Sequence, residues 1–100
     1  MKLKAVITAP ARLEIAEAIK YYEEQRPSFG VRFWLEFKLL IKRLKNFPEL
    51  YPRYGKRGIH KAPMHNYPHS VFYRVAGEEL RILGVVHGAI NPETVRPRFK

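Results

Sequence analysis

A run of apolar residues at helical spacing in the middle of the chain constrains the fold more than any other feature. Its members recur at steps of three and four residues: Phe33, Trp34, Phe37, Leu40, Ile41 and Leu44. This spacing predicts an amphipathic helix over residues 29–46, with Ser28 as its N-cap. A helix with one apolar face needs a second apolar surface to cover it, so the rest of the chain must supply one.

A weaker helical pattern lies about three residues before this one. It covers residues 9–25, and its apolar stripe consists of Ile15, Ile19 and Tyr22. Thr8 offers a hydroxyl N-cap, and Pro27 ends the helix because the residue before a proline avoids the helical region. The short separation of the two patterns predicts an antiparallel helical hairpin.

The remaining chain carries strand patterns. Alternating and continuous apolar runs predict strands over residues 2–7, 57–63, 69–76 and 80–87. The predicted fold class is therefore α+β, with the order β-α-α-β-β-β and the helical hairpin packed on one face of a small, mainly antiparallel sheet. The opposite face of the sheet is expected to stay partly open and to carry Phe72 and Arg74.

The connection at residues 46–55 cannot continue the second helix, because it contains two prolines and a glycine. Its larger apolar side chains are available to fill the edge of the core: Phe47, Leu50 and Tyr51. We expect an ordered connection.

Composition limits the class of protein. The chain has 100 residues, enough for a single domain over residues 1–100, and a formal net charge of +10 that favours an anionic partner. The absence of cysteine excludes disulfides and thiolate chemistry. No signal peptide or membrane-spanning run is present, so we expect a cytoplasmic protein without a membrane partner.

The positive charge is concentrated in the second half of the chain. Residues 50–77 contain no acidic residue, and aromatic side chains are interleaved with their cations. Cations that hold phosphates and rings that stack on bases are typical of nucleic-acid binding, and an acidic protein is the alternative partner. The predicted partner-binding or nucleic-acid-binding residues are Arg53, Lys56, Arg57, Lys61, Arg74, Arg96 and Arg98.

The histidines do not predict a metal site, because His60, His65 and His69 would splay along strands and lack a nearby carboxylate. No cofactor is expected. His87 is interpreted as a hydrogen-bonded residue at a strand end or, alternatively, as a general base. If the chain is a metal-independent endoribonuclease, its catalytic candidates are Arg57, Lys61, Arg74 and His87.

Several segments resemble the RelE/ParE toxin superfamily, in order along nearly the whole chain. Residues 11–23 resemble its first helix, and residues 46–52 resemble the NPxLYP connection of its ParE-like branch, also called plasmid stabilisation proteins. Residues 67–75 resemble the FPYxIxYRV strand, and residues 85–93 resemble the VLHxxRDPxxW ending, with Ile90-Asn91 in place of Arg-Asp. The positions where RelE-like nucleases carry arginines are here near Ser70 or His69 and near Ala89 or Ile90.

The resemblance implies the toxin of a type II toxin–antitoxin pair. A ParE-like member would inhibit DNA gyrase by binding it, and a cognate acidic antitoxin would neutralise it. The alternatives are a RelE-like endoribonuclease that cleaves mRNA on the ribosome, or a non-toxic binding module of the same fold. A homodimer and a heterotetramer with the antitoxin both stay open.

Overall fold

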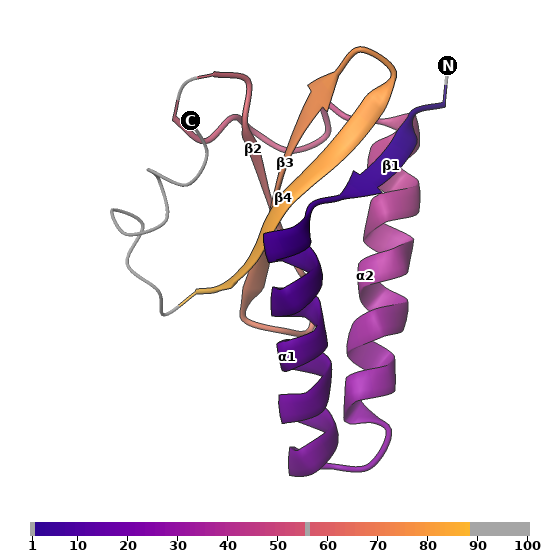
Figure 1. Ribbon diagram of the computed structural model, residues 1–100, viewed down its shortest axis with the longest axis vertical. Helices are drawn as coiled ribbons and strands as arrows, with labels where there is room; N and C mark the ends of the chain where they lie inside the picture. The colour runs from indigo at the N-terminus through magenta and orange to yellow at the C-terminus, as the bar shows by residue number, and fades with distance from the viewer. Residues whose placement is uncertain (1, 56, 89–100) are drawn as a thin grey trace.

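The computed structural model describes residues 2–55 and 57–88. The elements follow the predicted order (Figure 1): β1 (Lys4–Ile7), α1 (Ala9–Gln25), α2 (Phe29–Asn46), β2 (His60–Pro63), β3 (His69–Ala76) and β4 (Glu79–His87). Both helices and β3 have the predicted bounds. β1 and β2 begin later than predicted, and β4 begins one residue earlier.

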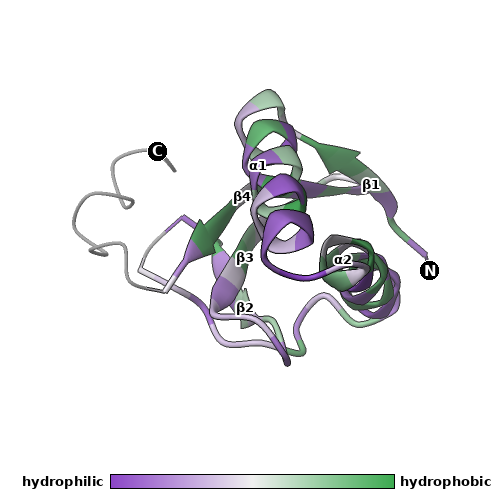
Figure 2. Cartoon of the chain, turned by 90° about the horizontal axis from the view of Figure 1, so that it is seen from below, coloured by the Kyte–Doolittle hydropathy of each residue, from purple (hydrophilic) through white to green (hydrophobic). Residues whose placement is uncertain are grey.

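The four strands form one mixed sheet in the order β1-β4-β3-β2. β1 runs parallel to β4, with Lys4 opposite Glu79, whereas the other neighbouring strands are antiparallel. Figure 2 shows both helices end-on beside the sheet, and their apolar residues share one core with the residues of its inner face. The predicted α+β fold with a helical hairpin on a mainly antiparallel sheet is confirmed.

The predicted stripe of α2 forms the centre of the core. Phe33, Phe37 and Leu44 are at most 1% exposed, and they share one cluster with Tyr73 and Ile82 from the inner face of the sheet. α1 contributes Ala11, Ile15, Ala18 and Tyr22 to the same cluster. The sheet thus supplies the apolar surface that the helical pattern required.

The helix starts lie where the sequence placed them, but the predicted hydroxyl caps are wrong. The Thr8 hydroxyl donates a hydrogen bond to the Ile82 carbonyl, 2.8 Å away, and so ties the start of α1 to β4. At Ser28 the cap comes from Glu23, whose carboxylate accepts hydrogen bonds from the N–H groups of Ser28 and Gly30 at 2.8 and 3.0 Å. A carboxylate at a helix N-terminus also interacts favourably with the helix dipole.

Two expectations about exposed surfaces are corrected. Phe47 and Leu50 do not fill the core but are 64% and 50% exposed, because the connection turns them outward. On the open face of the sheet, Phe72 is only 4% exposed, because Ile59 and Val86 pack around it in a second apolar cluster. A register shift between Phe72 and Tyr73 in the β3–β4 pairing marks a β-bulge there.

Candidate functional site

The open face of the sheet brings together two of the predicted cations, Lys61 and Arg74. Lys61 lies opposite Phe72, and Arg74 follows Phe72 by two residues along β3, so both project from the same face. Lys61 Nζ lies 5.6 Å from the centre of the Tyr54 ring and 6.0 Å from that of Phe72, which is a cation–π arrangement. The basic and aromatic residues of this segment therefore meet, although the Phe72 ring is buried and cannot stack on a base.

Arg74 has a second cation beside it. The β3–β4 register places Arg81 directly opposite Arg74. The Arg81 guanidinium donates a hydrogen bond to Glu79 Oε1 at 2.9 Å, so one of the two positive charges is already balanced. The net charge of this patch stays positive.

The other predicted cations contribute less to this face. Arg53 forms an isolated bridge with His60 beside β2, and Arg57 is an exposed turn residue with a left-handed backbone (φ 69°). Lys56, Arg96 and Arg98 lie outside the described residues. The structure therefore places Lys61 and Arg74 on one face of the sheet, whereas Arg53 and Arg57 lie in the segment before β2.

His87 projects from the opposite face of the sheet. It pairs with His69, and the centroids of the two rings lie 5.1 Å apart. His69 is three residues from Phe72 on the same strand, and its ring contacts Tyr22 and Phe33 of the helices. Because alternate strand residues point to opposite faces, the sheet itself separates His87 from the cations of the open face. The predicted set of Arg57, Lys61, Arg74 and His87 is not assembled into one site.

The His69–His87 pair borders a cavity of about 420 Å³ between α1 and the ends of β3 and β4. His69 is 9% exposed, and the Tyr22 hydroxyl oxygen lies 3.4 Å from its Nδ1. Burial lowers the pKa of His69 to about 4, with a further lowering from His87 and an opposing effect from Glu14. His69 is therefore a neutral core residue at physiological pH.

A second buried histidine fixes the connection at residues 47–54. His60 is 5% exposed, and its Nδ1–H donates a hydrogen bond to the Tyr51 carbonyl at 2.7 Å. Its ring stacks on Tyr73, with centroids 5.1 Å apart. The Tyr73 hydroxyl donates to the Pro48 carbonyl at 2.7 Å, and burial raises the pKa of Tyr73 to about 12. The connection is thus anchored from the core by two buried polar side chains.

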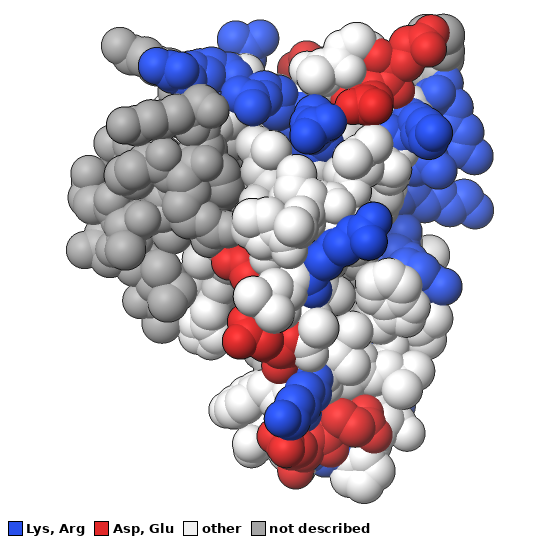
Figure 3. All heavy atoms as spheres, viewed as in Figure 1, with Lys and Arg blue, Asp and Glu red and all other residues white. Residues whose placement is uncertain are grey.

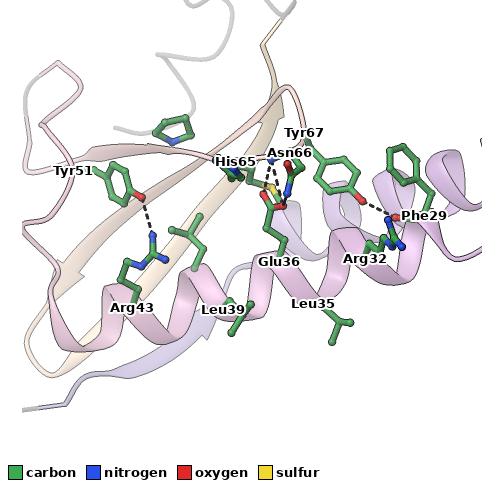
Figure 4. Close-up of a pocket in the computed structure, with 13 residues that line it drawn as sticks. Phe29, Arg32, Leu35, Glu36, Leu39, Arg43, Tyr51, His65, Asn66 and Tyr67 are labelled. Carbon is green, nitrogen blue, oxygen red and sulfur yellow. Dashed lines mark hydrogen bonds between the residues drawn. The ribbon is translucent and has the colours of Figure 1, made fainter.

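A concave surface runs along α2, and it was not predicted from the sequence. A groove of about 1160 Å³ lies between this helix and residues 63–67. Figure 4 shows Glu36 and Arg43 pointing from α2 toward the facing segments, while Leu35 and Leu39 extend from the outer side of the helix. Glu36 accepts hydrogen bonds from the backbone and side chain of Asn66, the shortest at 2.9 Å.

A signal for the exposed apolar side of α2, whose Leu35 and Leu39 line the groove, was present in the sequence. Val31, Leu35 and Leu39 recur at steps of four residues and form a second apolar stripe on α2, beside the one that enters the core. They are 54%, 49% and 65% exposed. An apolar stripe that the fold leaves uncovered marks an interaction surface.

Charge on the molecule is unevenly distributed. Figure 3 shows Lys and Arg side chains over much of its upper half, with an acidic patch among them at the upper right, and acidic side chains together with some cations over the helical hairpin below. Within the described residues, no group of three potential ligands is placed to hold a metal ion. In the same part of the chain, neither helix is long and apolar enough to span a bilayer.

The chain is similar to known toxin–antitoxin proteins. The profile of a family described as "ParE toxin of type II toxin-antitoxin system, parDE" matches residues 5–92. A chain from the chromosomal ParDE system of P. aeruginosa is 18% identical, with a TM-score of 0.75 over 86% of this chain and 96% of that chain. A chain from the RelBE2 toxin–antitoxin complex of Mycobacterium tuberculosis is 16% identical, with a TM-score of 0.59 over 87% of this chain and 99% of that chain. No curated protein sequence matches significantly.

Proposed function

This chain belongs to the ParE toxin family of type II toxin–antitoxin systems, and on that premise we propose that it inhibits DNA gyrase by binding the enzyme and that a cognate antitoxin neutralises it. Both partners act in the cytoplasm. The family resemblance supplies the expectation of gyrase as the target. The geometry of the chain supports inhibition by protein contact over RNA cleavage.

The observation that carries this choice is the position of His87. A metal-independent nuclease needs a base and phosphate-binding cations within reach of one phosphate. Here His87 lies with His69 on the helix side of the sheet, and Lys61 and Arg74 lie on the other side. The described residues therefore present cationic and apolar contact surfaces, and the sheet separates the His87 imidazole from the cations of the open face.

The α2 groove suits an acidic amphipathic helix of the antitoxin. Arg32 and Arg43 lie toward its two ends, eleven residues apart in the sequence, which is about 16 Å along a helix. Leu35 and Leu39 offer apolar area between them, while the carboxylate of Glu36 is already engaged by Asn66. An antitoxin helix with an apolar stripe and carboxylates about three turns apart would match this groove.

A supercoiling assay with purified components tests the proposal. The purified chain is expected to block supercoiling of relaxed plasmid by DNA gyrase, and a stoichiometric amount of antitoxin is expected to restore it. Supercoiling that is unaffected by an excess of the chain would contradict gyrase as the target.

The open face of the sheet keeps a ribosome-dependent nuclease as the second candidate, because Lys61 and Arg74 form a positive surface there. Primer extension after induction would then show cuts within translated codons. A chain whose expression leaves growth unchanged would instead be a non-toxic binding module.

A further inference from the structure

Phe47 and Leu50 form an exposed apolar pair on the connection after α2, which we call the 47/50 knob. Their side chains are 64% and 50% exposed. Neither residue belongs to the two apolar clusters, and neither lines the α2 groove. The fold and the proposed antitoxin site thus leave the knob unused.

Hydrogen bonds hold the backbone of the knob in place. The N–H of Phe47 donates to the Arg43 carbonyl at 2.9 Å, and the N–H of Leu50 donates to the Phe47 carbonyl at 3.1 Å. Two buried side chains also bind the backbone of this connection. Tyr73 donates a hydrogen bond to the carbonyl of Pro48, between the two residues, and His60 donates one to the carbonyl of Tyr51, just after them, each at 2.7 Å. A loop held by these four hydrogen bonds, three to groups outside it and one within it, cannot easily fold its apolar side chains back onto the molecule.

Such an arrangement lowers the conformational entropy lost on binding. A contact surface that already has its bound geometry gives more affinity per unit of buried area than a loop that must be ordered. Phe and Leu held in this way have the character of anchor residues that enter a pocket on a partner protein. Single exposed apolar residues are common on protein surfaces. Two that are held side by side by backbone hydrogen bonds indicate a contact surface.

The charge of the chain segment that carries the knob indicates the chemistry of the partner. Between residues 42 and 53 the chain carries four cations, Lys42, Arg43, Lys45 and Arg53, and one acid, Glu49. A second copy of this chain would bring the same positive surface and be repelled. A nucleic acid would use the cations but would leave Leu50 without a partner.

We propose that the 47/50 knob enters an apolar socket on an acidic surface of the protein that this toxin inhibits. The proposal rests on the proposed function, since it assigns the target contact of the toxin. It also separates the target surface from the α2 groove. Tyr51 lies next to both surfaces, because its side chain lines the groove and its carbonyl accepts the hydrogen bond from His60.

The test compares the Phe47→Ala/Leu50→Ala double variant with Leu13→Ala, whose side chain is 63% exposed on α1. The thermal midpoint of both variants is expected to match the wild-type chain, because the side chains make no core contact. The double variant is expected to need about tenfold or more protein for half-inhibition of gyrase supercoiling, and to lose growth arrest on expression. Leu13→Ala is expected to behave as wild type in both assays.

Antitoxin affinity, measured by calorimetry, distinguishes the surfaces. The double variant is expected to bind antitoxin as tightly as the wild-type chain does. Equal inhibition by the double variant and the wild type would overturn the proposal. The proposal would also be overturned if the double variant lost as much affinity for the antitoxin as it lost in inhibition, or if it lost only affinity for an RNA oligonucleotide.

Failure of the proposed function has a different signature. If the wild-type chain arrests growth without affecting gyrase, gyrase is the wrong target, and the growth assay still tests the knob. If the wild-type chain neither arrests growth nor inhibits gyrase, both proposals are wrong.

Discussion

Acidification should destabilise this protein through His69. The pKa of this buried imidazole is about 4 in the folded chain, against 6.5 for an unperturbed histidine. Between these two pH values the imidazole is protonated in the unfolded chain but neutral in the folded chain. The free energy of unfolding therefore decreases as the pH falls from about 6.5 to about 4. The difference corresponds to about 3 kcal/mol, because one pKa unit is about 1.4 kcal/mol.

The assay is urea unfolding of the wild-type chain and of His69→Gln at intervals between pH 4 and pH 7.5. Groups that titrate in both proteins, the carboxylates among them, cancel in the comparison. The free energy of unfolding of the wild-type chain should fall by up to about 1.4 kcal/mol more per pH unit than that of the variant. His65→Gln is the matched control, because His65 is exposed, and it should keep the wild-type slope.

Parallel pH dependences for wild type and His69→Gln would refute this reasoning. They would show that His69 gains its proton equally in both states. An NMR titration of the imidazole gives the same answer directly, since the folded chain should keep His69 neutral at pH 5.

Three further substitutions test the packing and the groove. Gly30→Ala should cost about 1–3 kcal/mol in urea unfolding, because a Cβ there would clash with the Ile19 carbonyl oxygen; unchanged stability would show that the helices can move apart. Tyr73→Phe should lower the free energy of unfolding by about 1 kcal/mol through loss of the hydrogen bond to Pro48, and equal stability would mean that this bond contributes nothing. Leu39→Glu should weaken antitoxin binding about tenfold or more in calorimetry, and wild-type affinity would place the antitoxin elsewhere.

The helices were predictable because two local signals agreed. The core stripe that includes Phe33 and Leu44 sets the period, and Pro27 ends the first helix, so the bounds 9–25 and 29–46 followed from sequence. Which group caps each helix was not predictable. Glu23 caps α2, and the Thr8 hydroxyl donates to the Ile82 carbonyl instead of capping α1, so both contacts depend on how the helices and β4 pack.

The candidate sites were only partly predictable, because they depend on strand faces and on the connection. Alternation along β3 placed Arg74 on the open face, but the separation of His87 from it required the β3–β4 register. The outward position of Phe47 could not be inferred either. An apolar residue in a proline-rich connection can face inward or outward, and here the hydrogen bond from Tyr73 to Pro48 helps to fix the path.

The central claim is that this toxin acts by binding DNA gyrase and not by cutting RNA. One measurement tests it most directly: plasmid supercoiling and primer extension of translated messages, taken from the same cells after induction of the chain. Our account predicts loss of negative supercoiling with messages uncut inside codons. Codon-specific cuts with normal supercoiling would contradict it.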